Sequence, residues 1–233
     1  MKTPRDRLIV ALDVASAAAA QQIVAAVGDA AQFYKVGKQL FTAEGPKVVR
    51  DLVASGRKVF LDLKFHDIPN TVAAAVAEAA KLNVTMLTVH ASGGGKMLRA
   101  AVEAASKSDI PPMILAVTVL TSMQDSDLPG IGVRGTVVDQ TLRLATLAIT
   151  NGCDGIVTSA LEVRELRSEL GDEFAIVTPG VRPPGSARGD QARVVTPAEA
   201  VAAGATHIVV GRPITAAPDP AAATREILQQ ISF

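Results

Sequence analysis

The chain has 233 residues, 48% of them hydrophobic, and its 23 basic side chains balance its 23 acidic ones. This length suits one large domain, and balanced charge without a basic, aromatic-rich stripe disfavours nucleic-acid binding. The single cysteine, Cys153, excludes an intrachain disulfide framework and is interpreted as a small buried hydrophobe. No apolar run is long enough to cross a membrane, and the N-terminus leads straight into a strand without a signal peptide. We therefore expect a soluble, cytoplasmic protein without membrane contact.

Short apolar runs alternate with Ala-rich helical stretches eight times along the chain. The predicted strands cover residues 8–12, 33–37, 59–63, 86–90, 114–119, 155–158, 174–178 and 207–211. The predicted helices cover residues 15–27, 43–54, 71–81, 96–106, 137–151, 160–170, 197–203 and 220–231. Continuous apolar strands between helices indicate a parallel sheet covered on both faces.

Eight such units in a chain of this length predict an α/β fold, a single-domain (β/α)8 TIM barrel over residues 1–233. A doubly wound sheet is the alternative, but the first strand is not followed by the glycine pattern of a dinucleotide site. Two connections are long for a barrel, at 120–136 and 179–196. Each is either a mobile surface loop or a lid over a ligand.

The segment from Asp62 to Asp67, with the sequence Asp-Leu-Lys-Phe-His-Asp, carries the strongest chemical signal. Side chains alternate along a strand, so Asp62 and Lys64 share a face, and Asp67 lies just beyond, where the chain turns toward the next helix. Charged groups at a partly desolvated barrel mouth are costly unless they pair. The pattern therefore indicates a working site.

Other polar residues also follow predicted strands, and the carboxyl ends of barrel strands carry active sites. Asp13 could cap the next helix, although Ser16 competes for that position, and Lys35 could extend to the surface. His66 and His90 are interpreted as structural. The spacing of acidic and histidine residues predicts no metal site, because acidic groups interleaved with lysines favour an ion-pair array.

Gly211 and Arg212 end the last predicted strand and form a candidate phosphate site. Glycine lets the backbone approach an anion, and the guanidinium group offers two parallel hydrogen bonds. Barrel phosphate sites commonly use the loops after the seventh and eighth strands. An arginine paired with a neighbouring carboxylate is the alternative.

Several motifs together resemble the orotidine 5′-phosphate decarboxylase family over essentially the whole chain. The motifs, in chain order, are Val10-Ala11-Leu12-Asp13, Lys35-Val36-Gly37, Asp62-x-Lys64-x-x-Asp67, Thr118-Val119-Leu120-Thr121-Ser122, Thr178-Pro179-Gly180-Val181-Arg182 and Val210-Gly211-Arg212-Pro213. The third motif also occurs in related sugar-phosphate decarboxylases and aldolases. The motifs at 118–122 and 178–182 narrow the resemblance to the orotidylate enzymes.

The resemblance implies cofactor-free decarboxylation of orotidine 5′-monophosphate to uridine 5′-monophosphate, the last step of de novo pyrimidine synthesis. By the family pattern, Lys64 stabilises and protonates the carbanion at carbon 6, and Asp62 lies against the departing carboxylate. Asp67 and Thr71 would come from the other subunit of a homodimer. Lys35 and Asp67 would be catalytic together with Asp62 and Lys64, and Lys35 and Asp13 would complete the charge array. The nucleotide would be bound as follows: the ribose by Asp13 and Lys35, the pyrimidine by Thr121 and Ser122, both base and phosphate by Gln191, and the phosphate by Arg182, Gly211 and Arg212.

Two other functions remain open from the sequence. A Mg²⁺-dependent sugar-phosphate decarboxylase or synthase of the same suprafamily would also keep Asp62, Lys64 and Asp67. A catalytically inactive barrel that binds a phosphate ligand is the third possibility. It would not need a lysine between two carboxylates.

Overall fold

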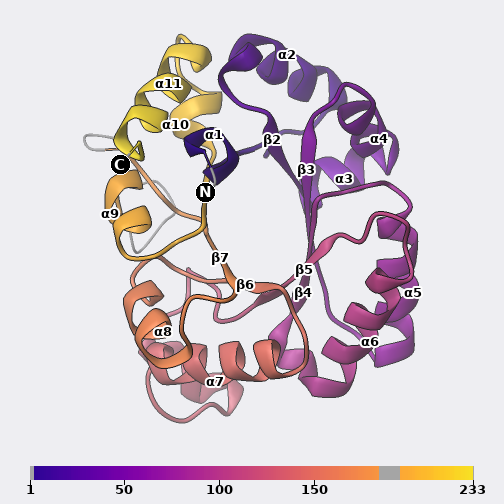
Figure 1. Ribbon diagram of the computed structural model, residues 1–233, viewed down its shortest axis with the longest axis vertical. Helices are drawn as coiled ribbons and strands as arrows, with labels where there is room; N and C mark the ends of the chain where they lie inside the picture. The colour runs from indigo at the N-terminus through magenta and orange to yellow at the C-terminus, as the bar shows by residue number, and fades with distance from the viewer. Residues whose placement is uncertain (1–2, 184–194, 233) are drawn as a thin grey trace.

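A computed structural model describes residues 3–183 and 195–232. Eight parallel strands form a closed barrel in chain order, with β8 paired to β1 (Figure 1). The strands are β1 Leu8–Ala11, β2 Phe33–Gly37, β3 Lys58–Phe65, β4 Met86–His90, β5 Met113–Val117, β6 Gly155–Val157, β7 Ala175–Thr178 and β8 His207–Val210. The predicted (β/α)8 TIM barrel is confirmed, and each predicted strand overlaps an observed one.

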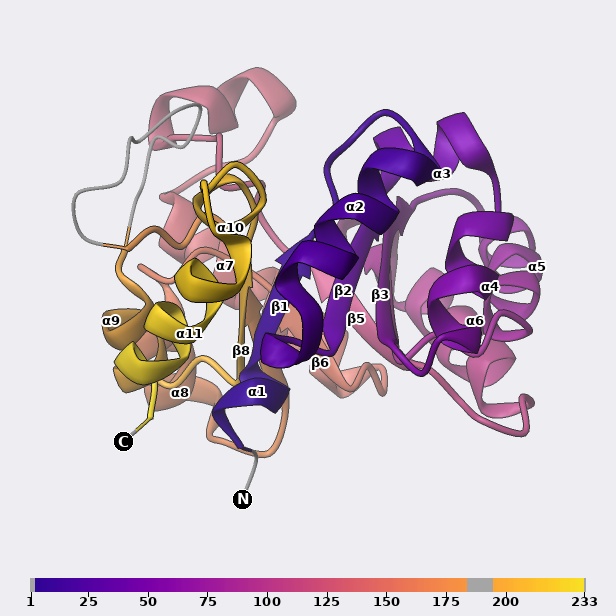
Figure 2. The same cartoon turned by 90° about the horizontal axis from the view of Figure 1, so that it is seen from above.

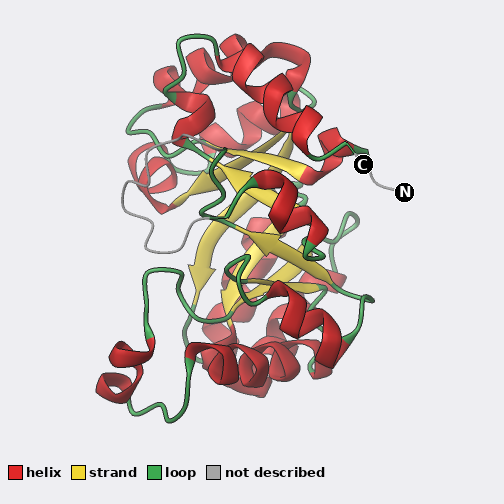
Figure 3. Ribbon diagram, turned by 90° about the vertical axis from the view of Figure 1, so that its left-hand side faces the viewer, coloured by secondary structure: helices red, strands yellow, loops and turns green. Residues whose placement is uncertain are grey.

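Helices surround the strands on the outside of the barrel (Figures 1 and 3). The α-helices are α1 Pro4–Arg7, α2 Ala17–Val27, α3 Lys38–Glu44, α4 Lys47–Ala54, α5 Pro69–Ala80, α6 Gly94–Ser106, α7 Val137–Thr150, α8 Val163–Leu170, α9 Pro197–Ala202, α10 Arg212–Thr215 and α11 Pro220–Gln230. The described residues also form the 3-10 helices η1 Gly28–Ala30, η2 Ala91–Gly93 and η3 Asp125–Ile131. In the described part of the chain, no helix combines the length and apolar character needed to cross a membrane.

Local chemistry explains where the helices differ from the sequence predictions. The N-terminus does not lead straight into a strand, because Thr3 and Asp6 form a capping box that starts the short helix α1. The single helix expected at 43–54 is two helices, α3 and α4. Gly45, with φ of 65°, ends the first, and Pro46 precedes the second.

The apolar core has two layers. Side chains at alternate positions of the strands point inward and fill the barrel interior, among them Phe33, Phe60 and Met86. A larger cluster lies between the strands and the helices. Each strand is therefore buried on both faces, which explains the continuous apolar runs in the sequence. Cys153 is buried as expected, and burial raises the pKa of its thiol to about 12.

The two ends of the barrel differ in what they carry. Figure 2 shows α1 and both termini at the end where β1 begins. The opposite end, where the strands finish, carries the charged residues of the predicted site. β3 continues there to Phe65, and its pairing with β4 shifts register between Leu61 and Phe65. Lys64 lies in this irregular stretch with φ of 54°, a conformation that few non-glycine residues adopt.

Candidate functional site

A cavity of about 360 Å³ opens at the carboxyl ends of the strands. Its floor consists of apolar side chains that also belong to the inner barrel core: Ala11, Phe60, Val117, Val157 and Val209. Charged side chains on or just after the first three strands and in the segments after β7 and β8 form its walls. An apolar floor under charged walls suits a ligand that has an apolar ring and anionic groups.

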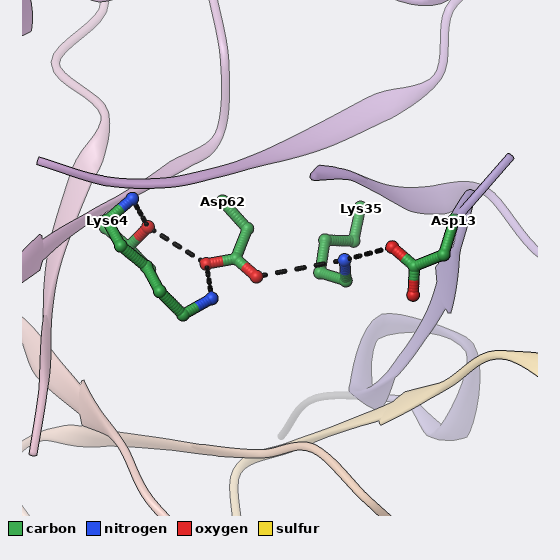
Figure 4. A network of polar contacts seen from close by, with 5 residues as sticks. Asp13, Lys35, Asp62 and Lys64 are labelled. Carbon is green, nitrogen blue, oxygen red and sulfur yellow. Dashed lines mark hydrogen bonds and ion pairs between the residues drawn. The ribbon is translucent and has the colours of Figure 1, made fainter. Parts of the chain in front are cut away.

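Four charged side chains of alternating sign line one wall (Figure 4). Asp13 follows β1, Lys35 lies on β2, and Asp62 and Lys64 lie on β3. The Lys35 Nζ is 2.7 Å from Asp13 Oδ1 and 3.8 Å from Asp62 Oδ2. The Lys64 Nζ is 2.6 Å from Asp62 Oδ1. The ion-pair array predicted from the sequence is therefore present.

Burial and charge oppose each other at Asp62, which is only 8% exposed. Burial alone would raise the pKa of its carboxyl group. The ammonium groups of Lys64 and Lys35 and the hydrogen bonds from Lys64 and Thr88 outweigh burial, and the net pKa lies below its usual value. Asp62 is therefore an anion at neutral pH, held between two cations.

The structure also decides the alternatives for the other two members of the network. Ser16, not Asp13, caps α2, because its side chain accepts a hydrogen bond from the Ala19 amide. The Asp13 carboxylate instead pairs with Lys35. Lys35 is 8% exposed, so it does not extend to the surface.

The candidate anion site lies beside the charged wall, since a Cβ atom on Gly211 would be 3.9 Å from Asp13 Oδ2. Arg182, Gly211 and Arg212 all line the cavity, although they come from the ends of β7 and β8. Arg182 is 7% exposed, and its guanidinium group donates to the Val181 carbonyl oxygen over 3.1 Å. Thr121, which follows β5, also lines the cavity. Cationic side chains from β2, β3 and the ends of β7 and β8 therefore line one cavity.

Three predicted site residues lie outside this cavity. Asp67 is exposed beyond β3, where its carboxylate accepts a hydrogen bond from the Ile68 amide over 2.6 Å. Thr71 is exposed on α5, and Ser122 is exposed after β5. Gln191 lies outside the described residues.

His66 and His90 pack against each other beside the site. Their ring centroids are 5.4 Å apart, and neither ring lines the cavity. Burial, and then the neighbouring His66, Lys64 and Lys38, lower the pKa of His90 to about 4. His90 is therefore uncharged at neutral pH. Among the residues described, no group of three or more His, Cys, Asp or Glu side chains is arranged to hold a metal ion.

Several uncharged residues of the cavity were not predicted from the sequence as site residues. Thr158, Pro179, Gly180 and Thr215 also line the cavity. Thr88, on β4, is fully buried beneath the charged wall and contacts both Asp62 and Lys64. A threonine within an apolar strand is the one signal that could have identified it, because a buried hydroxyl group needs a partner.

Comparison with known proteins gives one consistent result. The sequence profile described as "Orotidine 5'-phosphate decarboxylase / HUMPS family" matches residues 6–227. An orotidine 5′-phosphate decarboxylase of Idiomarina loihiensis is 52% identical over 225 residues, covering 97% of this chain and 97% of that protein. One of Moorella thermoacetica is 52% identical over 235 residues, covering 98% and 93%. The crystal structure of orotidine 5′-phosphate decarboxylase from Lactobacillus acidophilus superposes with a TM-score of 0.87 at 41% identity, covering 98% of this chain and all of that one.

Proposed function

The chain belongs to the orotidine 5′-phosphate decarboxylase / HUMPS family, and we propose that it is a carboxy-lyase acting on orotidine 5′-monophosphate. The products would be uridine 5′-monophosphate and CO2, and the reaction would need no cofactor. One observation carries this proposal: Lys64 and Asp62 form a 2.6 Å ion pair directly over an apolar cavity floor. A binding protein would gain nothing from such a costly pair.

The chemistry explains why a lysine is needed at this point. Loss of CO2 breaks the bond from carbon 6, and its electron pair stays on carbon 6 in the plane of the ring. The ring π system cannot delocalise this pair. Enzymes lower barriers by about 8–23 kcal/mol, and this reaction requires the upper end of that range. The Lys64 ammonium would stabilise the developing charge and then transfer one proton to carbon 6.

Asp62 would act on the substrate's carboxylate before the bond breaks. Its pKa is depressed, so it stays ionised next to an incoming anion. Repulsion between the two carboxylates accelerates the reaction only because it is relieved as CO2 departs. Lys35 would help hold the array and, with Asp13, would bind the ribose hydroxyl groups, consistent with their 2.7 Å contact at the cavity wall.

The ends of β7 and β8 would bind the substrate's phosphate. Arg182, Gly211 and Arg212 supply two guanidinium groups and a close backbone approach. Thr121 and Ser122 would contact the pyrimidine, and Gln191 would bridge base and phosphate. Binding energy from the phosphate would then be used to order the site around the reacting carbon.

A homodimer would complete each site, with Asp67 and Thr71 contributed across the interface. The support is the exposure of both side chains near the cavity mouth in the single chain, next to Ile68, which is 66% exposed. An exposed carboxylate beside a large exposed apolar side chain is consistent with a surface that a second subunit covers.

The competing functions predict different behaviour in one assay. Purified protein should convert orotidylate to uridylate, followed by the fall in ultraviolet absorbance, and should do so with a chelator present. Loss of activity with EDTA and recovery with Mg²⁺ would favour a sugar-phosphate enzyme. Absence of turnover with intact nucleotide binding would favour the inactive barrel.

Lys64→Ala tests the central role directly. We expect turnover to fall by several orders of magnitude, because the cavity wall offers no second ammonium at that position, while uridylate binding and the melting temperature change little. Retention of more than a tenth of the parent rate, a difference of about 1.4 kcal/mol, would exclude Lys64 as the group that stabilises the carbanion.

A further inference from the structure

We propose that Thr88 is a positioning residue, whose buried hydroxyl group fixes the Asp62 carboxylate and the Lys64 backbone relative to each other. The inference rests on the proposed function and deepens it, because it assigns the support of the reacting pair to a residue outside the cavity lining. Thr88 lies on β4 and is fully buried.

The hydroxyl group of Thr88 makes one hydrogen bond as a donor and one as an acceptor. It donates to Asp62 Oδ1 over 3.0 Å and accepts from the Lys64 amide over 2.9 Å. Asp62 Oδ1 in turn accepts from Lys64 Nζ over 2.6 Å. The contacts close a ring that runs from the Lys64 backbone through Thr88 and Asp62 to the Lys64 ammonium group. Both the start and the tip of the lysine side chain are therefore tied to one carboxylate.

The backbone at Lys64 explains why such a tie is needed. Leu61 pairs with Leu87 and Phe65 pairs with Val89, so four steps along β3 oppose only two along β4. The extra residues form a bulge opposite Thr88, and Lys64 has φ of 54° within it. A non-glycine residue in this region is strained and persists only when surrounding contacts hold it. Since the ladder is interrupted there, the Thr88 hydroxyl replaces the missing backbone acceptor for the Lys64 amide.

Thr88 is placed to support the charged residues and not to contact the substrate. It shares the inward face of β4 with Met86, but it does not line the cavity. The groups that face Asp62 are Lys64 from β3, Lys35 from β2 and Thr88 from β4, with His90 farther along the same strand. Of these four, Thr88 is the one whose hydroxyl group donates to Asp62 and also accepts from the Lys64 amide.

Thr88→Val is the central variant, because it keeps the shape of the side chain and deletes the hydroxyl group. We expect kcat to fall about 10- to 100-fold, the effect of losing a hydrogen bond to a charged group, with KM within about twofold of the parent. Thr88→Ser keeps the hydroxyl group and should retain kcat within about threefold. In Thr88→Val, NMR titration should also show a higher pKa for the Asp62 carboxyl group than in the parent.

Thr206→Val is the matched control. The Thr206 hydroxyl also accepts from a backbone amide, that of Ile176 over 3.0 Å, and donates to the Ile176 carbonyl oxygen over 2.9 Å. It lies at the entrance of β8, away from the charged wall. Thr206→Val should lower the free energy of unfolding about as much as Thr88→Val does and leave kcat unchanged.

Three results would overturn the proposal. The first is a kcat of Thr88→Val within twofold of the parent, and the second is a loss of kcat in Thr88→Ser as large as that in Thr88→Val. The third is a loss of kcat in Thr206→Val as large as that in Thr88→Val. If Thr88→Val folds too poorly to assay, Thr88→Ala removes the same two hydrogen bonds, and a parent-like kcat there is equally decisive. Should the parent fail to decarboxylate orotidylate, the proposed function fails, while the Asp62 titration still tests the positioning role.

Discussion

Gly37→Ala should lower activity without unfolding the protein, because its new methyl group would press on the charged wall. Gly37 ends β2 with φ of −95°, which alanine adopts without strain. A Cβ atom there would lie 2.9 Å from Lys35 Nζ and 3.2 Å from Asp13 Oδ1. Ordinary contact begins at about 3.4 Å, so the ammonium group must move by about 0.5 Å.

The size of the effect follows from the ion pair that is stretched. Lengthening the 2.7 Å contact between Lys35 and Asp13 by about 0.5 Å weakens it by about 1 kcal/mol at an effective dielectric constant near 20. This corresponds to about a fivefold change, and misplacement of the reacting groups adds to it. We expect kcat/KM for orotidylate to fall about 5- to 20-fold. The melting temperature should stay within about 3 °C, since alanine also restricts the unfolded chain.

Gly155→Ala provides the contrast. Its Cβ atom would lie 2.8 Å from the Cβ atom of Ala175 and against the same residue's backbone carbonyl group, neither of which can swing aside as a lysine tip can. We expect a large loss of stability in this variant, measured by denaturant unfolding. If Gly37→Ala kept kcat/KM within twofold of the parent at unchanged stability, the position of the Lys35 ammonium group would not matter for the reaction.

Three further predictions concern the other parts of the site. Arg212→Ala should raise KM for orotidylate and lower kcat, with partial rescue by guanidinium in solution; an unchanged KM would remove Arg212 from the phosphate site. Lys64→Ala and Asp67→Ala homodimers should each be nearly inactive, yet mixing them under subunit exchange should restore activity; inactive verified heterodimers would place Asp67 in its own chain's site. The free energy of unfolding should fall by about 1–2 kcal/mol as the pH drops from 6.5 to 4, because the pKa of half-buried His90 is lowered to about 4 and only the unfolded state takes up the proton there. The free energy of unfolding, measured by urea titration at each pH, should depend less on pH in His90→Gln than in the parent.

The barrel was predictable because its strands and caps follow local rules. Each strand is apolar on both faces, so eight continuous runs marked all eight strands. The break between α3 and α4 was missed, although Gly45 and Pro46 are strong helix terminators. The short helix α10 was missed, because Arg212 was interpreted only as an anion contact.

The charged wall was predictable in membership but not in geometry. Alternation along an extended strand placed Asp62 and Lys64 on one face, and their side chains do meet. The backbone between them is not a regular strand, however, and nothing in the sequence marks the positive φ of Lys64. Thr88 was missed because threonine is common in strands, so a hydroxyl group in an apolar run is too weak a signal to predict the two contacts it makes.

The alternation of sign along the wall determines how substitutions there must be interpreted. Removing Lys64 leaves Asp62 with the Lys35 ammonium group 3.8 Å away, whereas removing Asp62 leaves two ammonium groups facing each other without the anion between them. The second change exposes a buried like-charge pair, so its cost includes repulsion that the native protein does not contain. Losses measured for single variants will therefore exceed each residue's own contribution and will not add. A double variant that removes both Asp62 and Lys64 restores neutrality and isolates the catalytic loss from the electrostatic one.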